Sequence, residues 1–355
     1  MRQTELAGKA QTVLGIIDPD SLGVTLPHEH LLTDVSVVYF IEPDVASERE
    51  LVHKPVSLEI LWWLRQHYFS NLDDMRFTDE DLAIKDALLY KWAGGSTIVE
   101  LSNVGLYRDP LGLARISRAT GLNIIMGSGY YVWTTHPPEL ASMTDEKIAE
   151  EIIRDIVVGV GNTGIRAGII GEIGCSEPLH DDERKVLRAA AIAQRRTGAA
   201  INVHPSLSDS FALEIMQILS DKGADLSRTV FSHCDQTGYS QATQRKLMDA
   251  GCYLEHDAFG WEEMSPPVRG NIIDMPNDTK RINDIIQLID DGYLNNILIS
   301  GDHCFKHRLT AYGGYGYAHI IRDVTPMMLA KGISNEQIHT LMVENTKRML
   351  TFVAV

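Results

Sequence analysis

The chain has 355 residues, of which 44% are apolar and 23% charged, and it carries a formal net charge of −16. This length suits one large barrel or two ordinary domains, the composition is that of a soluble globular enzyme, and the negative charge argues against a nucleic-acid partner. The four cysteines form no close pairs, so neither a disulfide framework nor a cysteine zinc site is expected. The N-terminal segment lacks the apolar core of a signal peptide, and no apolar run reaches the length of a membrane helix. We therefore expect a cytoplasmic protein with no membrane partner.

Eight short runs rich in apolar and β-branched residues recur along the chain and predict eight strands, with helical patterns between most of them. Residues 182–196 carry an apolar stripe at helical spacing and precede Gly198, a residue typical of a helix stop. Thr78 with Asp81, and Ser334 with Gln337, have the spacing of capping boxes that open helices. The predicted strands are 23–30, 96–102, 123–130, 167–174, 199–204, 229–234, 251–258 and 296–302.

The alternation of strands and helices predicts a parallel sheet, and eight repeats of that unit favour an α/β fold of the (β/α)8 TIM barrel type. A doubly wound open sheet is the alternative, but the glycine-rich phosphate turn that follows its first strand is missing. Two connections, 31–95 and 259–295, are longer than one helix requires. Insertions at the C-terminal face of a barrel shape the mouth of its active site. The sequence shows no linker and no repeat, so residues 1–355 are expected to form one domain.

Histidines and carboxylates end several of the predicted strands. His28 and His30 are two residues apart, so on a strand they point the same way and can share one metal ion. Glu172 lies within an apolar run, where an unpaired carboxylate is costly to bury and requires a cation. A lone strand-end histidine is usually a hydrogen-bonded core residue, and an aspartate after a strand is usually a helix cap. Six such residues together favour a metal site, formed by His28, His30, Glu172, His204, His233 and Asp302.

Six ligands exceed the needs of one catalytic zinc, which takes three and a water, and they suit two ions about 3.5–4 Å apart. A hydroxide held between the ions would be the nucleophile, because bound metal lowers the pKa of water to roughly 7. Zinc is the default metal for a histidine-rich site, although manganese, cobalt or iron could occupy the same ligands. The natural division places one ion on His28, His30 and Asp302, the other on His204 and His233, and Glu172 between them.

This order of ligands (His-x-His, a bridging residue on the fourth strand, His, His and Asp) resembles that of the phosphotriesterase family of the amidohydrolase superfamily. The resemblance covers essentially the whole chain. It implies a metal-dependent hydrolase barrel with two divalent ions, and it is compatible with a homodimer. The segments 8–15, 27–31, 170–175 and 312–317 look most like the phosphotriesterase-related proteins of that family.

One position departs from the well-studied members, which bridge their metals with a carboxylated lysine on the fourth strand. Glu172 has the same formal charge and needs no carbon dioxide to assemble. The resemblance implies that this glutamate branch is less associated with phosphotriester hydrolysis, whereas members elsewhere hydrolyse lactones, including sugar lactone phosphates, and N-acyl amides. By the same resemblance, Asp302 would accept the proton of the attacking water and later protonate the leaving group.

Two further positions follow from the resemblance, each with an ordinary alternative. Tyr130 ends the third predicted strand and would hydrogen-bond the substrate oxygen, unless it is a core tyrosine. Asp235 lies two residues after His233 and would relay a proton or orient a ligand, unless it caps a helix.

Charged residues near the mouth are candidates for substrate contacts. Glu255 and His256 end the seventh strand and would either touch the substrate or orient the metal ligands. Lys306 follows the eighth strand, near which barrel enzymes often bind phosphate, so it would hold a substrate anion or form a solvated basic turn. Arg281, in the second insertion, has the same two interpretations.

We interpret the chain as a binuclear metal hydrolase that cleaves a carboxylic ester, lactone or N-acyl amide bond of a small molecule. A phosphotriesterase or phosphodiesterase is the second hypothesis, because the same hydroxide attacks carbon or phosphorus. A non-catalytic binding protein on the same barrel is the third. The presence of all six ligand types argues against it, because a binder needs no site that activates water.

Overall fold

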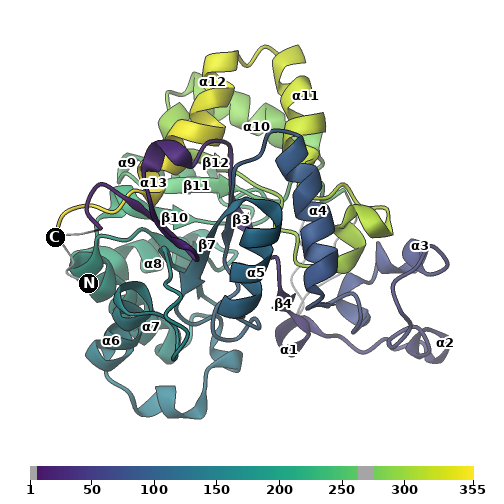
Figure 1. Cartoon of the computed structure of the whole chain (residues 1–355), viewed down its shortest axis with the longest axis horizontal. Coiled ribbons are helices and arrows are strands. Elements are labelled where there is room, and N and C mark those ends of the chain that lie inside the picture. The colour runs from purple at the N-terminus through teal and green to yellow at the C-terminus, as the bar shows by residue number, and fades with distance from the viewer. Residues whose placement is uncertain (1–5, 263–274) are drawn as a thin grey trace.

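The computed structural model describes residues 6–262 and 275–355, and it is built around eight parallel strands in the order β12-β11-β10-β9-β8-β7-β6-β3. The two outer strands of this order meet: the backbone N–H of Asp302 donates to the carbonyl oxygen of His28 at 3.3 Å, so the sheet curls into a barrel. Helices alternate with the strands and surround them (Figure 1). The strands are β3 Thr25–Glu29, β6 Thr97–Glu100, β7 Asn123–Ser128, β8 Ile169–Gly174, β9 Ile201–His204, β10 Thr229–Phe231, β11 Tyr253–His256 and β12 Ile297–Ile299.

All eight predicted strands are confirmed, and each is shorter than its run in the sequence. Their central residues are buried because a parallel barrel covers both faces of every strand. The polar ends of the runs leave the hydrogen-bonded ladder, so that His30, His233 and Asp302 lie just beyond β3, β10 and β12. The (β/α)8 barrel is confirmed, and the open doubly wound sheet is wrong.

The helices of the barrel pack their apolar faces on the strands. Helix α7 confirms the predicted helix and ends at Gly198, which has the left-handed conformation (φ 75°) of a glycine helix stop. The capping box predicted at Thr78 is wrong by one residue, because the side chain of Asp79 accepts from the backbone N–H of Leu82. The helices are α4 Glu80–Trp92, α5 Pro110–Thr120, α6 Asp145–Val157, α7 Asp181–Thr197, α8 Asp209–Asp221, α9 Gln241–Asp249 and α10 Asp278–Asp290.

The C-terminal segment contains α11 Thr325–Ala330, α12 Asn335–His339 and α13 Asn345–Leu350, and α13 packs against β12 at the side of the barrel (yellow in Figure 1). The capping box of Ser334 and Gln337 is confirmed at the start of α12. The side chain of Asn345 donates to the carbonyl oxygen of Ile297 at 2.7 Å and thereby ties α13 to β12. Within the described residues, no helix is both long and apolar enough to span a membrane.

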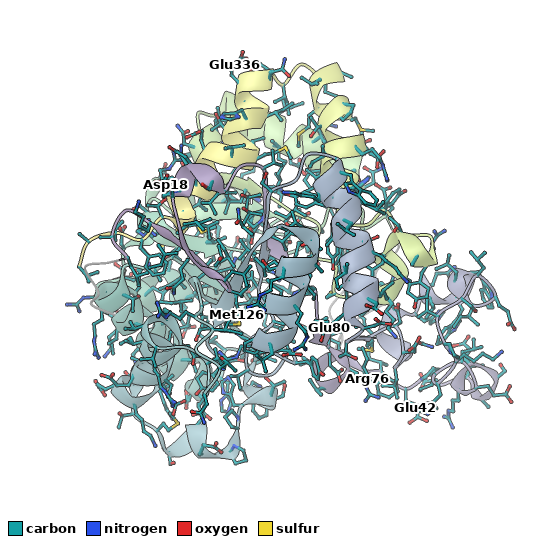
Figure 2. All side chains as sticks on the ribbon, in the orientation of Figure 1. Asp18, Glu42, Arg76, Glu80, Met126 and Glu336 are labelled. Carbon is teal, nitrogen blue, oxygen red and sulfur yellow. The ribbon has the colours of Figure 1, made fainter. Side chains whose placement is uncertain are left out.

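The first insertion forms a small lobe beside the barrel mouth, at the right of Figure 1. It holds the short helices α1 Ser36–Tyr39, α2 Ala46–Arg49 and α3 Leu61–Leu64 and a small antiparallel ladder of β4 Thr33–Asp34 with β5 Arg76–Phe77. A second small hairpin, β1 Ala10–Thr12 with β2 Gly15–Ile17, precedes the barrel, and neither ladder was predicted. Charged side chains such as Glu42 of this lobe and Glu336 are exposed at the periphery (Figure 2).

Candidate metal centre and active site

The six ligand-type side chains predicted from the sequence converge at the C-terminal end of the barrel. His28 is fully buried on β3, and Glu172 on β8 is 2% exposed. The described residues contain three clusters that draw only on these six side chains and whose ligand atoms lie within 4.8 Å of one another. They are His28–His30–Glu172, Glu172–His204–His233 and His28–His233–Asp302. Chain segments far apart in the sequence are thus brought to one point by the barrel, because parallel strands end at the same face.

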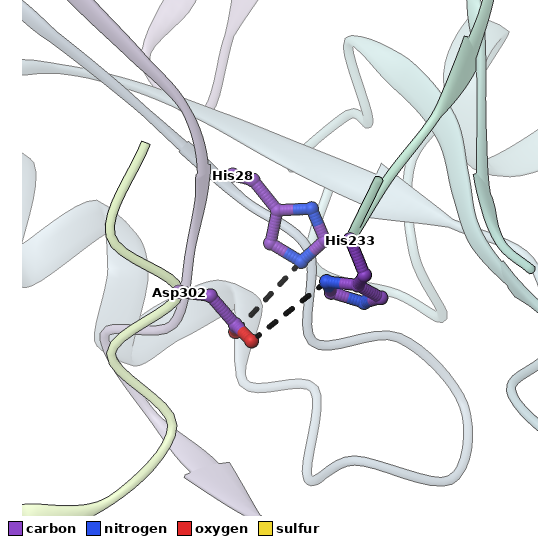
Figure 3. Close-up of side chains that lie close together, drawn as sticks. All are labelled: His28, His233 and Asp302. Carbon is purple, nitrogen blue, oxygen red and sulfur yellow. Dashed lines mark ion pairs between the residues drawn. The ribbon is translucent and has the colours of Figure 1, made fainter. Parts of the chain in front are cut away.

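Glu172 lies at the centre of this group. Its Oε1 atom is 2.8 Å from Nδ1 of His204, 2.9 Å from Nε2 of His233 and 3.6 Å from Nε2 of His28. It belongs to two of the three clusters, which is the position that a bridging carboxylate requires. Oδ1 of Asp302 lies 3.2 Å from Nε2 of His30 and 3.9 Å from Nε2 of His28. Its Oδ2 atom lies 3.9 Å from Nδ1 of His233, and Figure 3 shows Asp302 facing His28 and His233.

Polar side chains around the cluster hold the imidazole rings in place. Nδ1 of His28 lies 3.0 Å from Oε2 of Glu255, and Nδ1 of His30 lies 2.9 Å from the hydroxyl of Ser102. Nδ1 of His233 lies 2.9 Å from Asp257. In each ring one nitrogen is engaged by the protein, so the other is left to face the cluster. Such partners fix the tautomer of a metal-binding histidine and raise its basicity.

Two of the ligand residues have a left-handed backbone, with φ 55° at His233 and φ 46° at Asp302. Non-glycine residues rarely adopt this conformation, and each instance costs of order 1–3 kcal/mol unless its surroundings impose it. Here the backbone N–H of His233 donates to Asp257 at 2.9 Å, and the carboxylate of Glu29 accepts from the N–H groups of Gly301 and His303. These bonds hold both turns so that the side chains point at the site.

The electrostatics of the group favour cations. Burial by itself lowers the pKa of His28, but the carboxylates of Glu172, Asp257 and Glu255 outweigh it and raise that pKa to about 10. Burial raises the pKa of Glu172, yet His204 and His28 hold it well below its usual value, and His30 acts likewise on the pKa of Asp302. Glu172 and Asp302 are therefore ionised, and positive charge must be supplied either by protons on the rings or by metal ions.

The donor set fits divalent metal ions. Nε2 of His28 is buried and has no hydrogen-bond partner among the described residues, although it faces Glu172 and Asp302 at 3.6 and 3.9 Å. These separations are too long for hydrogen bonds and are those of atoms that share an ion. Imidazole nitrogens with carboxylate oxygens are the ligands of zinc and of the neighbouring transition metals.

A cavity of about 210 Å³ opens above the ligands. His30, Glu172, His204, His233 and Asp302 form its polar floor. Much of its wall is aromatic and aliphatic, with side chains from the first insertion and from the segments that follow β6, β7, β11 and β12. These are Val35, Val38, Tyr39, Tyr68, Phe69, Leu106, Tyr131, Val132, Trp261, Met275, Cys304 and Phe305.

The structure places Tyr130 away from this cavity and brings Tyr131 into it. The hydroxyl of Tyr130 donates to Glu151 of α6, whereas that of Tyr131 lies 3.3 Å from Nδ1 of His204 and 2.6 Å from the hydroxyl of Tyr39. Strand β7 ends at Ser128, and Gly129 after it has a positive φ. This turn breaks the strand alternation of side chains on which the prediction of Tyr130 depended.

The two candidates on β11 point to opposite sides of the barrel wall. Glu255 faces inward and orients His28, which is the second of the two roles predicted for it. His256 faces outward and lines a separate cleft of about 430 Å³ beside α9 and α10, so it does not reach the metal cluster.

The remaining charged candidates form hydrogen bonds with other residues of the protein. Arg281 is fully buried and donates to Asp235 at 2.7 Å, and Lys306 donates to Asp73 at 2.7 Å. Neither of these basic side chains lines the cavity. Asp235 also accepts from the backbone N–H of Ala258, so it anchors the chain after β11 to α10 and is not a helix cap.

Several site residues were not predicted from the sequence. Tyr39, Tyr68 and Phe69 belong to the first insertion, where no periodic pattern placed them relative to the barrel. Asp257, by contrast, could have been found from the sequence, because it directly follows β11 and strand alternation places it on the same face as Glu255.

Comparisons with known proteins identify the family of this chain. The model of the phosphotriesterase family matches residues 8–350. The chain is 40% identical over 350 residues to an N-acetyltaurine hydrolase of Danio rerio (98% of this chain and 99% of that protein) and 42% identical, with the same coverage, to a phosphotriesterase-related protein of Nematostella vectensis. Its fold is similar to that of a resiniferatoxin-binding protein from Rhodobacter sphaeroides, with a TM-score of 0.93, 36% identity and coverage of 97% of this chain and 96% of the other. The chain therefore belongs to the phosphotriesterase family and is a hydrolase.

Proposed function

We propose that this protein is a binuclear metal-dependent hydrolase that cleaves the N-acyl amide bond of a small molecule. The observation that carries the proposal is the position of Glu172: one carboxylate oxygen lies within 3.6 Å of imidazole nitrogens from His28, His204 and His233, at the floor of a cavity. A carboxylate at such a point has the geometry of a bridge between two cations.

The division of the residues between two ions that the sequence suggested is kept in this proposal. When bound, two such ions lower the pKa of water to roughly 7 and polarise the oxygen of a substrate carbonyl. Zinc is the expected metal, since histidine dominates the ligands. One ion would be held by His28, His30 and Asp302, the other by His204 and His233, and Glu172 would contact both.

Two kinds of side chain would act on the substrate. Asp302 lies at the edge of the cavity floor, and its carboxylate would take the proton of the attacking water and deliver it to the nitrogen of the leaving amine. The hydroxyl groups of Tyr39 and Tyr131 are paired at 2.6 Å beside His204, and one of their two protons is left over to donate to the oxygen of the scissile carbonyl.

The choice of an amide substrate is supported by relatives that cover the whole chain. Those of Danio rerio and Homo sapiens, each 40% identical to it, are named N-acetyltaurine hydrolases. Carboxylic esters and lactones present the same carbonyl and are tested beside amides. Phosphotriesters are the weaker candidate, because Glu172 stands at the position of the carboxylated lysine by which the well-studied phosphotriesterases bridge their metals.

The test is turnover of a panel of N-acyl amino acids, N-acyl taurines, lactones and phosphotriesters by the zinc-loaded protein. Products are identified by mass spectrometry, with and without a strong chelator. Chelator-sensitive release of free amine is expected from at least one N-acyl compound. Turnover confined to lactones or to phosphotriesters would contradict the amide assignment, and turnover that survives complete metal removal would contradict the metal-dependent reaction.

A further inference from the structure

We propose that the cleft between α9 and α10 is a second ligand site, and that it binds a small neutral molecule with neighbouring hydroxyl groups, either a polyol or a monosaccharide. This α9–α10 cleft has a volume of about 430 Å³, which lies within the range of small-molecule sites. It is lined by His256 of β11, by the segment 234–239 that follows β10 and by side chains of the two helices. None of the six candidate metal ligands lines it.

Buried polar atoms of three residues in this cleft have no hydrogen-bond partner within the described residues 6–262 and 275–355. They are both ring nitrogens of His256, Oδ1 of Asp235 and Nε2 of Gln236. His256 is 3% exposed, and the side chain of Asp235 is 1% exposed. Buried polar groups are nearly always hydrogen-bonded, because an unpaired group gives up its contacts with water and gains nothing in return. The gathering of such atoms in one cleft points to a bound molecule as their partner.

These atoms supply hydrogen-bond donors and acceptors side by side. Burial lowers the pKa of His256 below 6.5, so its ring is neutral near pH 7 and offers one N–H donor and one acceptor nitrogen. The side-chain amide of Gln236 donates, and the carboxylate oxygen of Asp235 accepts. A hydroxyl group both donates and accepts, so neighbouring hydroxyl groups can satisfy all of them. A carboxylate or a sulfonate only accepts, and it would leave Asp235 without a partner.

The charges of the α9–α10 cleft favour a neutral ligand. Each charged side chain that lines the described part of the cleft already belongs to an ion pair. The pairs are Asp235–Arg281 at 2.7 Å, Arg245–Asp291 at 2.8 Å and Lys280–Asp284. An ionic ligand would have to break one of these pairs or enter without a counter-charge. The further lining side chains Gln241, Gln244 and Gln287 add uncharged amides, which bind hydroxyl groups without any change in net charge.

The α9–α10 cleft adjoins the active-site cavity but lies outside the barrel wall. Leu207 and Gln236 line both hollows. Oδ2 of Asp235 accepts from Arg281 and from the backbone N–H of Ala258, and these bonds hold its Oδ1 atom on the side of the cleft. A molecule bound there would therefore contact the residues between the two hollows and not the metal ligands.

The experiment titrates glycerol, myo-inositol and D-glucose into the zinc-loaded protein and follows binding by saturation-transfer NMR of the ligand. At least one of these neutral compounds is expected to bind saturably, with a dissociation constant on the order of 1 mM, as is usual for ligands of this size. Glycerol and D-glucose distinguish a polyol site from a monosaccharide site. D-glucuronate and D-glucosamine, which carry a charge, should bind at least about tenfold more weakly than D-glucose.

Variants locate the bound molecule. His256→Phe and Gln287→Trp should each weaken binding at least about tenfold, the first by removing both ring nitrogens and the second by filling the cleft. Gln287 is exposed on α10, so its replacement leaves the core intact if His256→Phe fails to fold. Asn283 is exposed on the same helix and does not line the cleft, so the control Asn283→Trp should keep the affinity.

Three results would overturn the proposal. They are the absence of saturable binding by all three neutral compounds, binding of the charged sugars as tight as that of D-glucose, and binding that survives Gln287→Trp. Binding is measured without turnover, and neither His256 nor Gln287 lines the active-site cavity. The α9–α10 cleft is therefore tested independently of the proposed amide hydrolysis.

Discussion

Replacement of Glu255 by glutamine should weaken metal binding without abolishing the reaction at saturating metal. Glu255 is fully buried on β11, and its Oε2 atom receives hydrogen bonds from the hydroxyl of Ser232 at 2.7 Å and the amide of Asn202 at 3.0 Å. Nδ1 of His28 lies 3.0 Å from the same oxygen. Nδ1 of His28 therefore carries the ring proton and donates it to Glu255, and Nε2 of His28 is left to bind the metal.

The size of the effect follows from the charge that is lost. A glutamine oxygen in the same place still accepts these hydrogen bonds, so the ring keeps its orientation, but the negative charge that makes His28 more basic is removed. Loss of such a partner typically costs 10- to 100-fold in metal affinity, which corresponds to about 1.4–2.8 kcal/mol. The expected result is a zinc dissociation constant raised by that factor and a kcat at saturating zinc within about threefold of the unchanged enzyme.

The assay is a titration of zinc against a competing fluorescent chelator, followed by turnover at saturating zinc. Glu183→Gln is the matched control: Glu183 is also fully buried, but its carboxylate accepts from the backbone N–H groups of His180, Ser176 and Trp133. The control should lose thermal stability and keep its zinc affinity. An unchanged zinc affinity in Glu255→Gln, or an equal loss in the control, would refute the reasoning.

Three further predictions concern single side chains. Asp302→Asn should lower kcat at least about 100-fold at saturating zinc, because a proton acceptor is lost, and near-normal turnover would remove Asp302 from the reaction. Tyr131→Phe should lower kcat about tenfold or more with unchanged metal content, whereas Tyr130→Phe, which loses a bond to Glu151, should lower only the thermal midpoint; the reverse pattern would restore Tyr130 as the substrate contact. Burial lowers the pKa of His319, but hydrogen bonds to two aspartates raise it above 6.5, so its stabilisation is complete below pH 6.5 and is lost as pH rises through the higher folded value. His319→Asn should therefore lose about 1.5–3 kcal/mol of unfolding free energy at pH 6 and less at pH 9.5, as measured by urea titration, and a loss independent of pH would contradict the assigned charge.

The cluster of candidate metal ligands could be predicted from the sequence because its signal is local. Each ligand ends a strand whose apolar run is recognisable on its own, and the C-terminal ends of parallel strands meet at one face of a barrel. Glu172 was conspicuous because a carboxylate within the run Ile169–Gly174 has no solvent to stabilise it. The six ligand-type residues could therefore be assigned to one site from their positions at strand ends, without any distance between them.

The remaining site residues depended on contacts that no local pattern contains. Arg281 looked available for an anion, but its partner Asp235 is 46 positions away in the sequence. Lys306 is paired with Asp73, which is 233 positions away. Tyr130 was predicted as the last residue of the third strand, but β7 ends at Ser128, and a shift of one residue reverses the face on which a side chain lies.

The aromatic side chains of the cavity wall could not be predicted from the sequence for the same reason. Phe69 comes from the first insertion and Phe305 follows β12, yet their rings are neighbours in the folded chain. Insertions carry little periodicity, so their side chains acquire a role only when the barrel supplies the opposite wall.

The most direct test of the metal-dependent reaction is the number of ions that restores activity. Protein stripped by exhaustive chelation is titrated with zinc while bound metal and amide hydrolysis are followed together. For a binuclear centre, we expect bound zinc to saturate at two equivalents per chain and full activity to require the second equivalent. Glu172→Gln should bind at least one ion more weakly. Full activity with one equivalent or with none would contradict a binuclear centre.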